Sequence, residues 1–265
     1  MHYEVINLRE EENGFTPTLT AYILDNPSDR PEEEPRQRPA VVVCPGGGYG
    51  SCSKREAEPI AMQFLAAGFH AFVLNYSVAP FKFKRALEEV SMSIALVRKN
   101  AEKWDVLPDK IAVCGFSAGG HLACSIGTLW NSDYIEVNKG LNKPNAMILG
   151  YPVITYGEFT HQGTFENLCG DDEDLKKKLS LETQVSKDTP PAFIWHTYED
   201  QSVPVENSLV LAGALRKAGV PFDLHIYQKG GHGLSTATPE VGIDGGCSTA
   251  VPGWIGIAAS WLKDL

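Results

Sequence analysis

From residue 40 onward, short and wholly apolar runs alternate with longer segments whose apolar residues recur at helical spacing. A run without polar positions predicts a strand buried on both faces, and intervening helices cover both sides of a parallel sheet. The alternation therefore predicts an α/β fold with a mostly parallel central sheet and helices on both faces. The expected strands cover residues 40–44, 70–75, 110–115, 145–150, 192–197 and 222–227. The expected helices cover residues 54–67, 82–104, 118–129, 205–218 and 253–265.

The N-terminal segment follows a different pattern. Residues 3–8 and 18–24 alternate apolar and polar side chains on either side of EEENGFTP, which predicts an antiparallel hairpin at a sheet edge. Residues 26–39 are rich in proline and charge, so we expect an exposed surface loop. With 265 residues in total, we expect a single domain, residues 1–265.

Residues 151–190 are the longest interval without a strand-like run. Their charge block DDEDLKKK, at 171–178, is by itself typical of a solvated helix face. Long insertions in compact domains are often functional, however, so we expect residues 151–190 to form a small cap over the site.

The pentapeptide at 115–119 fits the G-x-S-x-G pattern, with Ser117 at its centre. An expected strand precedes it and an expected helix follows it, which is the context that this motif requires. The flanking glycines allow a sharp turn that presents the Ser117 hydroxyl at the carboxyl end of the sheet. The alternative, an N-capping serine in a glycine-rich turn, does not need this context, so we favour Ser117 as a nucleophile.

A serine nucleophile needs an imidazole to take its proton and a carboxylate to orient that imidazole. Asp200 follows the expected strand 192–197, and His232 follows the expected strand 222–227, between glycines. We favour Asp200 over its neighbour Glu199 as the acid, because it lies further into the loop. The other histidines have structural interpretations; His121, for example, is expected to pack under the sheet.

The glycine run at 46–50 follows the first expected parallel strand. Neither G-x-G-x-x-G nor a following G-K-[ST] is present, so a nucleotide site is not indicated. Backbone N–H groups in such a run can hold the oxyanion that forms when a serine attacks a carbonyl. We expect the oxyanion hole to consist of Gly47, Gly48 and Ala118, with the choice between Gly46 and Gly47 left open.

Charge, cysteine content and hydropathy limit the partners, metals and cell compartment that we expect. The formal net charge is −10, which repels phosphate backbones, so nucleic acid is not expected. The six cysteines form no C-x-x-C pair or Cys/His cluster, so no metal and no disulfide framework is expected. No segment has the length of a membrane span and the N-terminus lacks a signal pattern, so we expect a cytoplasmic protein. The oligomeric state is left open.

Five motifs resemble the α/β-hydrolase superfamily, and within it small serine esterases related to acetyl xylan and feruloyl esterases and to the hormone-sensitive-lipase branch. They are CPGGGY at 44–49, NYSVAP at 75–80, GFSAGG at 115–120, TPPAFIWHTYEDQSVPVENS at 189–208 and GGHGLS at 230–235. Pro45 stands where the lipase branch has the histidine of its H-G-G-G motif, which favours the xylan-esterase-like group. The resemblance implies an α/β-hydrolase fold and hydrolysis of short acyl esters, often acetyl groups on sugars, without a cofactor.

Two other functions remain as hypotheses. A serine peptidase of the prolyl-oligopeptidase type shares the motif and the order of the triad, and a non-catalytic ligand-binding relative shares the fold. The substrate is also open: Tyr49, Tyr76 and Tyr151 are candidate contacts for a sugar ring or an acyl chain, although aromatic residues of this kind can equally belong to the core.

Overall fold

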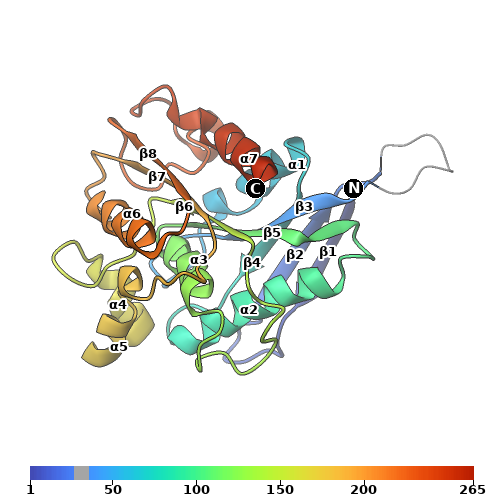
Figure 1. The fold of residues 1–265 in the computed structure, drawn as a ribbon, viewed down its shortest axis with the longest axis horizontal. Coiled ribbons are helices and arrows are strands. Elements are labelled where there is room, and N and C mark those ends of the chain that lie inside the picture. The colour runs from blue at the N-terminus through green and yellow to red at the C-terminus, as the bar shows by residue number, and fades with distance from the viewer. Residues whose placement is uncertain (27–35) are drawn as a thin grey trace.

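The computed structural model describes residues 1–26 and 36–265 and shows one eight-stranded sheet flanked by helices (Figure 1). The strands are β1 (His2–Asn7), β2 (Thr18–Ile23), β3 (Arg38–Cys44), β4 (His70–Asn75), β5 (Val106–Phe116), β6 (Ala146–Gly150), β7 (Ala192–Thr197) and β8 (Phe222–Tyr227). The helices are α1 (Glu58–Ala66), α2 (Phe83–Lys99), α3 (Ala118–Leu129), α4 (Gln162–Cys169), α5 (Glu173–Lys178), α6 (Glu206–Ala218) and α7 (Trp254–Asp264).

The strand order is β1-β2-β4-β3-β5-β6-β7-β8. The pairs β1·β2 and β2·β4 are antiparallel, and every pair from β4·β3 to β7·β8 is parallel. The predicted hairpin and the predicted parallel sheet are thus both confirmed, and the architecture is that of the α/β-hydrolase fold. In a sheet of this kind the loops that follow the parallel strands gather at one edge, where ligands bind.

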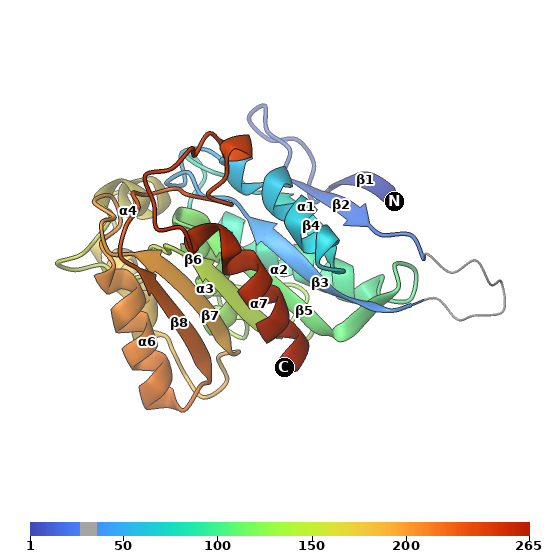
Figure 2. The same ribbon diagram turned by 90° about the horizontal axis from the view of Figure 1, so that it is seen from above.

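The core has two layers, one on each face of the sheet. Helices α2, α3 and α6 pack their apolar side chains on one face, while α1 and α7 cover the other (Figure 2). The middle strands are buried on both faces: Val41, Val42 and Val43 of β3 are wholly inaccessible to solvent. This double burial is the physical reason for the continuous apolar runs in the sequence.

Several element boundaries differ from the expected ones. The predicted strand 110–115 is part of a longer strand, β5, which begins at Val106. The predicted helix 82–104 ends at Lys99, after which residues 101–105 form turns. The predicted helix 54–67 is a 3₁₀ turn, Lys54–Glu56, followed by α1, because Pro59 opens the α-helix and lacks the N–H of a continuing helix.

The proline-rich segment predicted as an exposed loop, residues 26–39, lies largely outside the described residues, which omit 27–35. Its last part is not loop: β3 begins at Arg38, whose side chain is buried. In the part of the chain that the structure describes, no helix combines the length and apolarity that crossing a bilayer requires.

The interval 151–190 contains α4, α5 and a 3₁₀ turn at Leu181–Thr183. Asp172 caps the N-terminus of α5 by accepting a hydrogen bond from the Leu175 N–H at 2.9 Å. Asn207 of α6 ties the start of the interval to the body of the domain, because its side-chain oxygen accepts from the N–H groups of Ile154 and Thr155. That this segment acts as a cap stays a prediction.

Candidate active site

Ser117 lies at the turn between β5 and α3 with a backbone conformation that non-glycine residues rarely adopt, φ 53° and ψ −121°. Such a conformation costs about 1–3 kcal/mol and persists only where the surroundings enforce it. Here the Ser117 N–H donates to the Gly150 carbonyl at 3.1 Å, and the Ser117 carbonyl accepts from the Val153 N–H at 3.0 Å. The strained turn is therefore pinned to the end of β6.

The glycines around Ser117 are required by close backbone contacts. A Cβ atom at Gly119 would lie 2.1 Å from the carbonyl oxygen of Cys44, and one at Gly115 would lie 2.1 Å from the carbonyl oxygen of Gly119. No side chain fits such distances. The G-x-S-x-G pattern therefore needs glycine at both ends, because α3 packs closely against the ends of β3 and β5.

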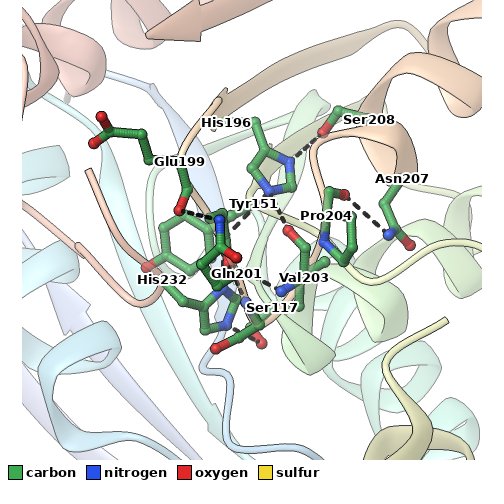
Figure 3. A network of polar contacts seen from close by, with 12 residues as sticks. Ser117, Tyr151, His196, Glu199, Gln201, Val203, Pro204, Asn207, Ser208 and His232 are labelled. Atoms are coloured by element: carbon green, nitrogen blue, oxygen red, sulfur yellow. Dashed lines mark hydrogen bonds and ion pairs between the residues drawn. The ribbon is translucent and has the colours of Figure 1, made fainter. Parts of the chain in front are cut away.

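The structure brings Ser117, His232 and Asp200 into one hydrogen-bonded chain. Figure 3 labels Ser117 and His232 of this chain. His232 Nε2 lies 2.8 Å from Ser117 Oγ, and His232 Nδ1 lies 2.6 Å from Asp200 Oδ2. Because a carboxylate only accepts, Nδ1 carries the proton and Nε2 offers its lone pair to the serine hydroxyl. This arrangement is the one in which an imidazole can take the proton of an attacking serine.

The Asp200 side chain is fully buried, which by itself would raise its pKa. Hydrogen bonds from His196 and His232, together with one from the Val203 N–H, outweigh burial and hold the pKa of Asp200 well below its usual range. The Oδ1 atom accepts from the N–H groups of Ser202 and Val203, both at 2.9 Å. Asp200 is therefore a fixed anion beside His232.

Glu199, the alternative acid, is exposed and directed away from Ser117 in Figure 3. Its carboxylate accepts from the Gly230 N–H at 3.1 Å and so supports the loop that carries His232. His121, expected to pack under the sheet, is wholly buried, where its Nε2–H donates to the Leu179 carbonyl at 3.0 Å.

The glycine run at 46–50, here called the oxyanion loop, passes close to the nucleophile: a Cβ atom at Gly46 would lie 3.0 Å from Ser117 Cβ. Gly46 is buried and its N–H donates to Glu56 Oε2 at 2.8 Å, so this N–H is already committed. Gly47 is exposed, with φ 129°. Among the hydrogen bonds of the described residues, none uses the N–H of Gly47 or Gly48. These contacts favour Gly47 over Gly46 as a donor.

Ala118 supplies the third expected donor. It is the first residue of α3, and the N–H groups of a first helical turn have no partner within the helix. Its N–H therefore points out of the helix N-terminus beside Ser117, where the helix dipole favours negative charge. The role of Gly47, Gly48 and Ala118 in holding an oxyanion stays a prediction.

The three candidate contacts for substrate, Tyr49, Tyr76 and Tyr151, are buried, and each is at most 1% accessible. Their hydroxyl groups are engaged inside the protein. Tyr76 donates to the Pro45 carbonyl at 2.7 Å and Tyr151 donates to Glu56 at 2.6 Å, while Tyr49 lies 3.2 Å from His121 Nδ1. The three rings therefore belong to the core, which is the alternative that the sequence left open for them.

Three residues at the site were not singled out from the sequence: Glu56, Asn167 and His196. Glu56 stands in the charged run KRE, which is typical of a solvated turn, yet it is buried. Asn167 of α4 donates to the Gly48 carbonyl at 2.9 Å, and nothing in its sequence surroundings indicates this. His196 directly precedes the acid loop, and its Nε2 lies 3.3 Å from Asp200 Oδ2, so its position was the one available signal.

Comparisons with known proteins identify the family of this chain. The BD-FAE family model matches residues 29–215. The chain is 38% identical over 245 residues to endo-1,4-beta-xylanase B of Butyrivibrio fibrisolvens, covering 87% of this chain and 36% of that protein. It is 34% identical over 228 residues to an acetylxylan esterase of Xylanibacter ruminicola, covering 83% of this chain and 44% of that protein. The chain thus spans less than half the length of these two relatives.

Among solved structures, the acetyl ester-xyloside bifunctional hydrolase of Caldicellulosiruptor lactoaceticus superposes with a TM-score of 0.85 at 39% identity. The match covers 98% of this chain and 96% of that one, so the whole fold is shared. Because the family model covers well over half of the sequence, this chain belongs to the BD-FAE family of α/β-hydrolase-fold esterases.

Proposed function

We propose that this esterase hydrolyses short-chain acyl esters, acetyl esters above all, on sugars or xylo-oligosaccharides. The observation that carries the proposal is the hydrogen-bonded chain from Asp200 through His232 to Ser117. Relatives named as an acetylxylan esterase and an acetyl ester-xyloside hydrolase support the acetyl group and the sugar.

The proposed reaction has two halves. Ser117 Oγ attacks the acyl carbon while His232 Nε2 accepts its proton, and the N–H groups of Gly47, Gly48 and Ala118 stabilise the oxyanion. The tetrahedral intermediate collapses, His232 returns the proton to the leaving alcohol, and the acyl group stays on Ser117. Water then attacks this ester with His232 as the base, and the acid leaves as Ser117 is restored.

The test is hydrolysis of p-nitrophenyl acetate, butyrate and octanoate by the wild type and by Ser117→Ala, followed by acetylated xylobiose. We expect acetate to give the highest kcat/KM and Ser117→Ala to lower kcat by about 10⁴-fold or more, because residues that act as one unit lose nearly all catalysis together. Faster turnover of octanoate would contradict the acyl preference, and equal rates for both proteins would remove the role of Ser117.

The alternatives have their own outcomes in the same experiment. Cleavage of a dipeptide amide without cleavage of acetyl esters would establish a peptidase instead. A wild type that neither turns over esters nor reacts with a fluorophosphonate probe at Ser117 would indicate a ligand-binding protein.

A further inference from the structure

The two loops that flank Ser117 come from opposite parts of the chain. The oxyanion loop, residues 46–50, follows β3, and the segment that carries His232, residues 228–235 and here called the histidine loop, follows β8. Both must hold their places within a few tenths of an ångström for donors and base to act on one substrate. The 3₁₀ turn Lys54–Glu56 is hydrogen-bonded to both loops, to Gly46 through the Glu56 side chain and to Ser235 through the Arg55 carbonyl. Its last residue, Glu56, is buried.

Glu56 contacts both sides of the site. One carboxylate oxygen, Oε2, accepts from the Gly46 N–H at 2.8 Å, next to the proposed donor Gly47. The other oxygen, Oε1, accepts from the Tyr151 hydroxyl at 2.6 Å. Glu56 is 3% accessible, so both hydrogen bonds are shielded from water. Hydrogen bonds are stronger in such a buried environment than at the surface.

Tyr151 continues the connection to the histidine loop. Its hydroxyl accepts from the Ser235 N–H at 2.9 Å while donating to Glu56. Its ring meets the imidazole of His232 edge to face, with centroids 5.1 Å apart (Figure 3). Its own backbone is fixed to β7 through a hydrogen bond from the Tyr151 N–H to the Trp195 carbonyl at 2.7 Å. A continuous path therefore runs from Gly46 to His232.

We propose that Glu56 and Tyr151 are positioning residues that hold the oxyanion loop and the histidine loop in one arrangement around Ser117. The inference rests on the proposed esterase function. It adds a role for Glu56, which makes its hydrogen bonds to the Gly46 N–H and the Tyr151 hydroxyl, and for Tyr151, which acts through the imidazole of His232 and through Ser235.

The path requires a carboxylate and a phenol. In Glu56 the two donors use different oxygens, Oε2 for Gly46 and Oε1 for Tyr151. A glutamine replaces one of these oxygens with an NH2 group, so one of the two donors loses the acceptor that it has in the wild type. A phenylalanine at position 151 keeps the ring against His232 and removes the link to Glu56 and Ser235. The two substitutions therefore interrupt the same connection at different points.

The experiment measures kcat and KM for p-nitrophenyl acetate in Glu56→Gln, Tyr151→Phe and the double variant, normalised to active sites titrated with a fluorophosphonate. Losing one oxyanion donor lowers kcat about 10²–10³-fold, so we expect a displaced donor in Glu56→Gln to lower it about 10- to 100-fold with little change in KM. We expect about tenfold for Tyr151→Phe, and for the double variant a loss close to that of Glu56→Gln alone, because the two residues act as one unit.

A trifluoromethyl ketone, whose adduct with Ser117 carries an oxyanion, separates positioning from folding. We expect its Ki to rise by the same factor by which kcat/KM falls, because both report transition-state stabilisation. The matched control is Tyr156→Phe, which breaks a tyrosine–glutamate hydrogen bond of 2.8 Å, to Glu173, at the protein surface. We expect wild-type kcat and Ki from this control.

Wild-type kcat and Ki in Tyr151→Phe would overturn the positioning role. A fall in total activity that disappears when the rate is divided by the number of titrated sites would overturn it as well. An inert wild type would overturn the proposed function itself, and with it this inference. The two failures are thus distinguishable by the wild-type rate.

Discussion

Asp200 shows at the scale of one residue how hydrogen bonds determine which proton is where. Its Oδ1 accepts two backbone N–H groups, so an amide at this position must place its oxygen there. The amide nitrogen would then face His232 Nδ1 and force the imidazole proton onto Nε2. An imidazole in that tautomer has no lone pair for the hydroxyl of Ser117.

We therefore expect Asp200→Asn to lower kcat by about 10⁴-fold, the loss that the wrong tautomer causes in serine proteases, while leaving the fold intact. The measurement is kcat for p-nitrophenyl acetate at pH 7. Glu199→Gln is the matched control, because that carboxylate is exposed and makes no hydrogen bond to His232. The glutamine keeps an oxygen that can accept from the Gly230 N–H, so its kcat should stay near that of the wild type. A larger loss in Glu199→Gln than in Asp200→Asn would reverse the assignment of the acid.

At the scale of elements, the position of Ser117 depends on how closely α3 approaches β3. Gly119 lies in the first turn of α3, where any Cβ would meet the carbonyl oxygens of Cys44 and Pro45 at 2.1 and 2.3 Å. These are backbone atoms of a buried strand end, so they cannot move aside as a flexible side chain could.

We expect Gly119→Ala to lower the free energy of unfolding by about 3 kcal/mol, the upper part of the range for overpacked cores. Gly213→Ala is the control in a helix without that constraint: nothing lies within 4 Å of its Cβ position in α6. There the smaller backbone entropy of alanine should stabilise the protein by about 0.5–1 kcal/mol. The measurement is the free energy of unfolding in urea for the wild type, Gly119→Ala and Gly213→Ala. Equal values for the three proteins would refute the argument from close packing.

At the scale of the whole molecule, stability depends on histidines that fold in the neutral form. Burial lowers the pKa of His121 to about 4, and burial together with the charge of Arg38 lowers that of His70 to about 4. In the unfolded chain both titrate near pH 6.5. Between about pH 6.5 and pH 4 the unfolded state therefore binds more protons, and stability falls as the pH falls through this window.

For His121, the difference between the pKa values of the folded and unfolded states lowers the free energy of unfolding by about 3 kcal/mol from pH 7 to pH 4. Asp200 adds a further loss at lower pH, because its folded pKa is depressed and its contribution disappears once the carboxylate is protonated. The free energy of unfolding is measured by urea unfolding at pH 7, 6, 5 and 4.5. It should change less steeply with pH in His121→Gln than in the wild type. His2→Gln, at an exposed position, should keep the pH dependence of the wild type. The same pH dependence in all three proteins would contradict the role of His121.

The sequence by itself determined where strands and helices alternate along the chain and that the sheet begins with an antiparallel pair. It also identified Ser117, Asp200 and His232 as candidates for the site. These features are local: doubly buried strands need continuous apolar runs, and a nucleophile on a sharp turn needs glycines at fixed offsets. Element ends were less well determined, as the early end of α2 and the early start of β5 show. Those ends depend on contacts with neighbouring elements that no local pattern records.

Only the tertiary structure decided which polar groups meet. Glu56 lies in a charged run that predicts exposure, yet it is buried because the oxyanion loop and Tyr151 both supply donors for it. The same contacts occupy the N–H of Gly46, which favours Gly47 as the predicted donor, and they engage the hydroxyl of the buried Tyr151. The physical reason is that a buried carboxylate is stable only where hydrogen bonds from residues distant in the chain converge on it, and such convergence is a property of the fold.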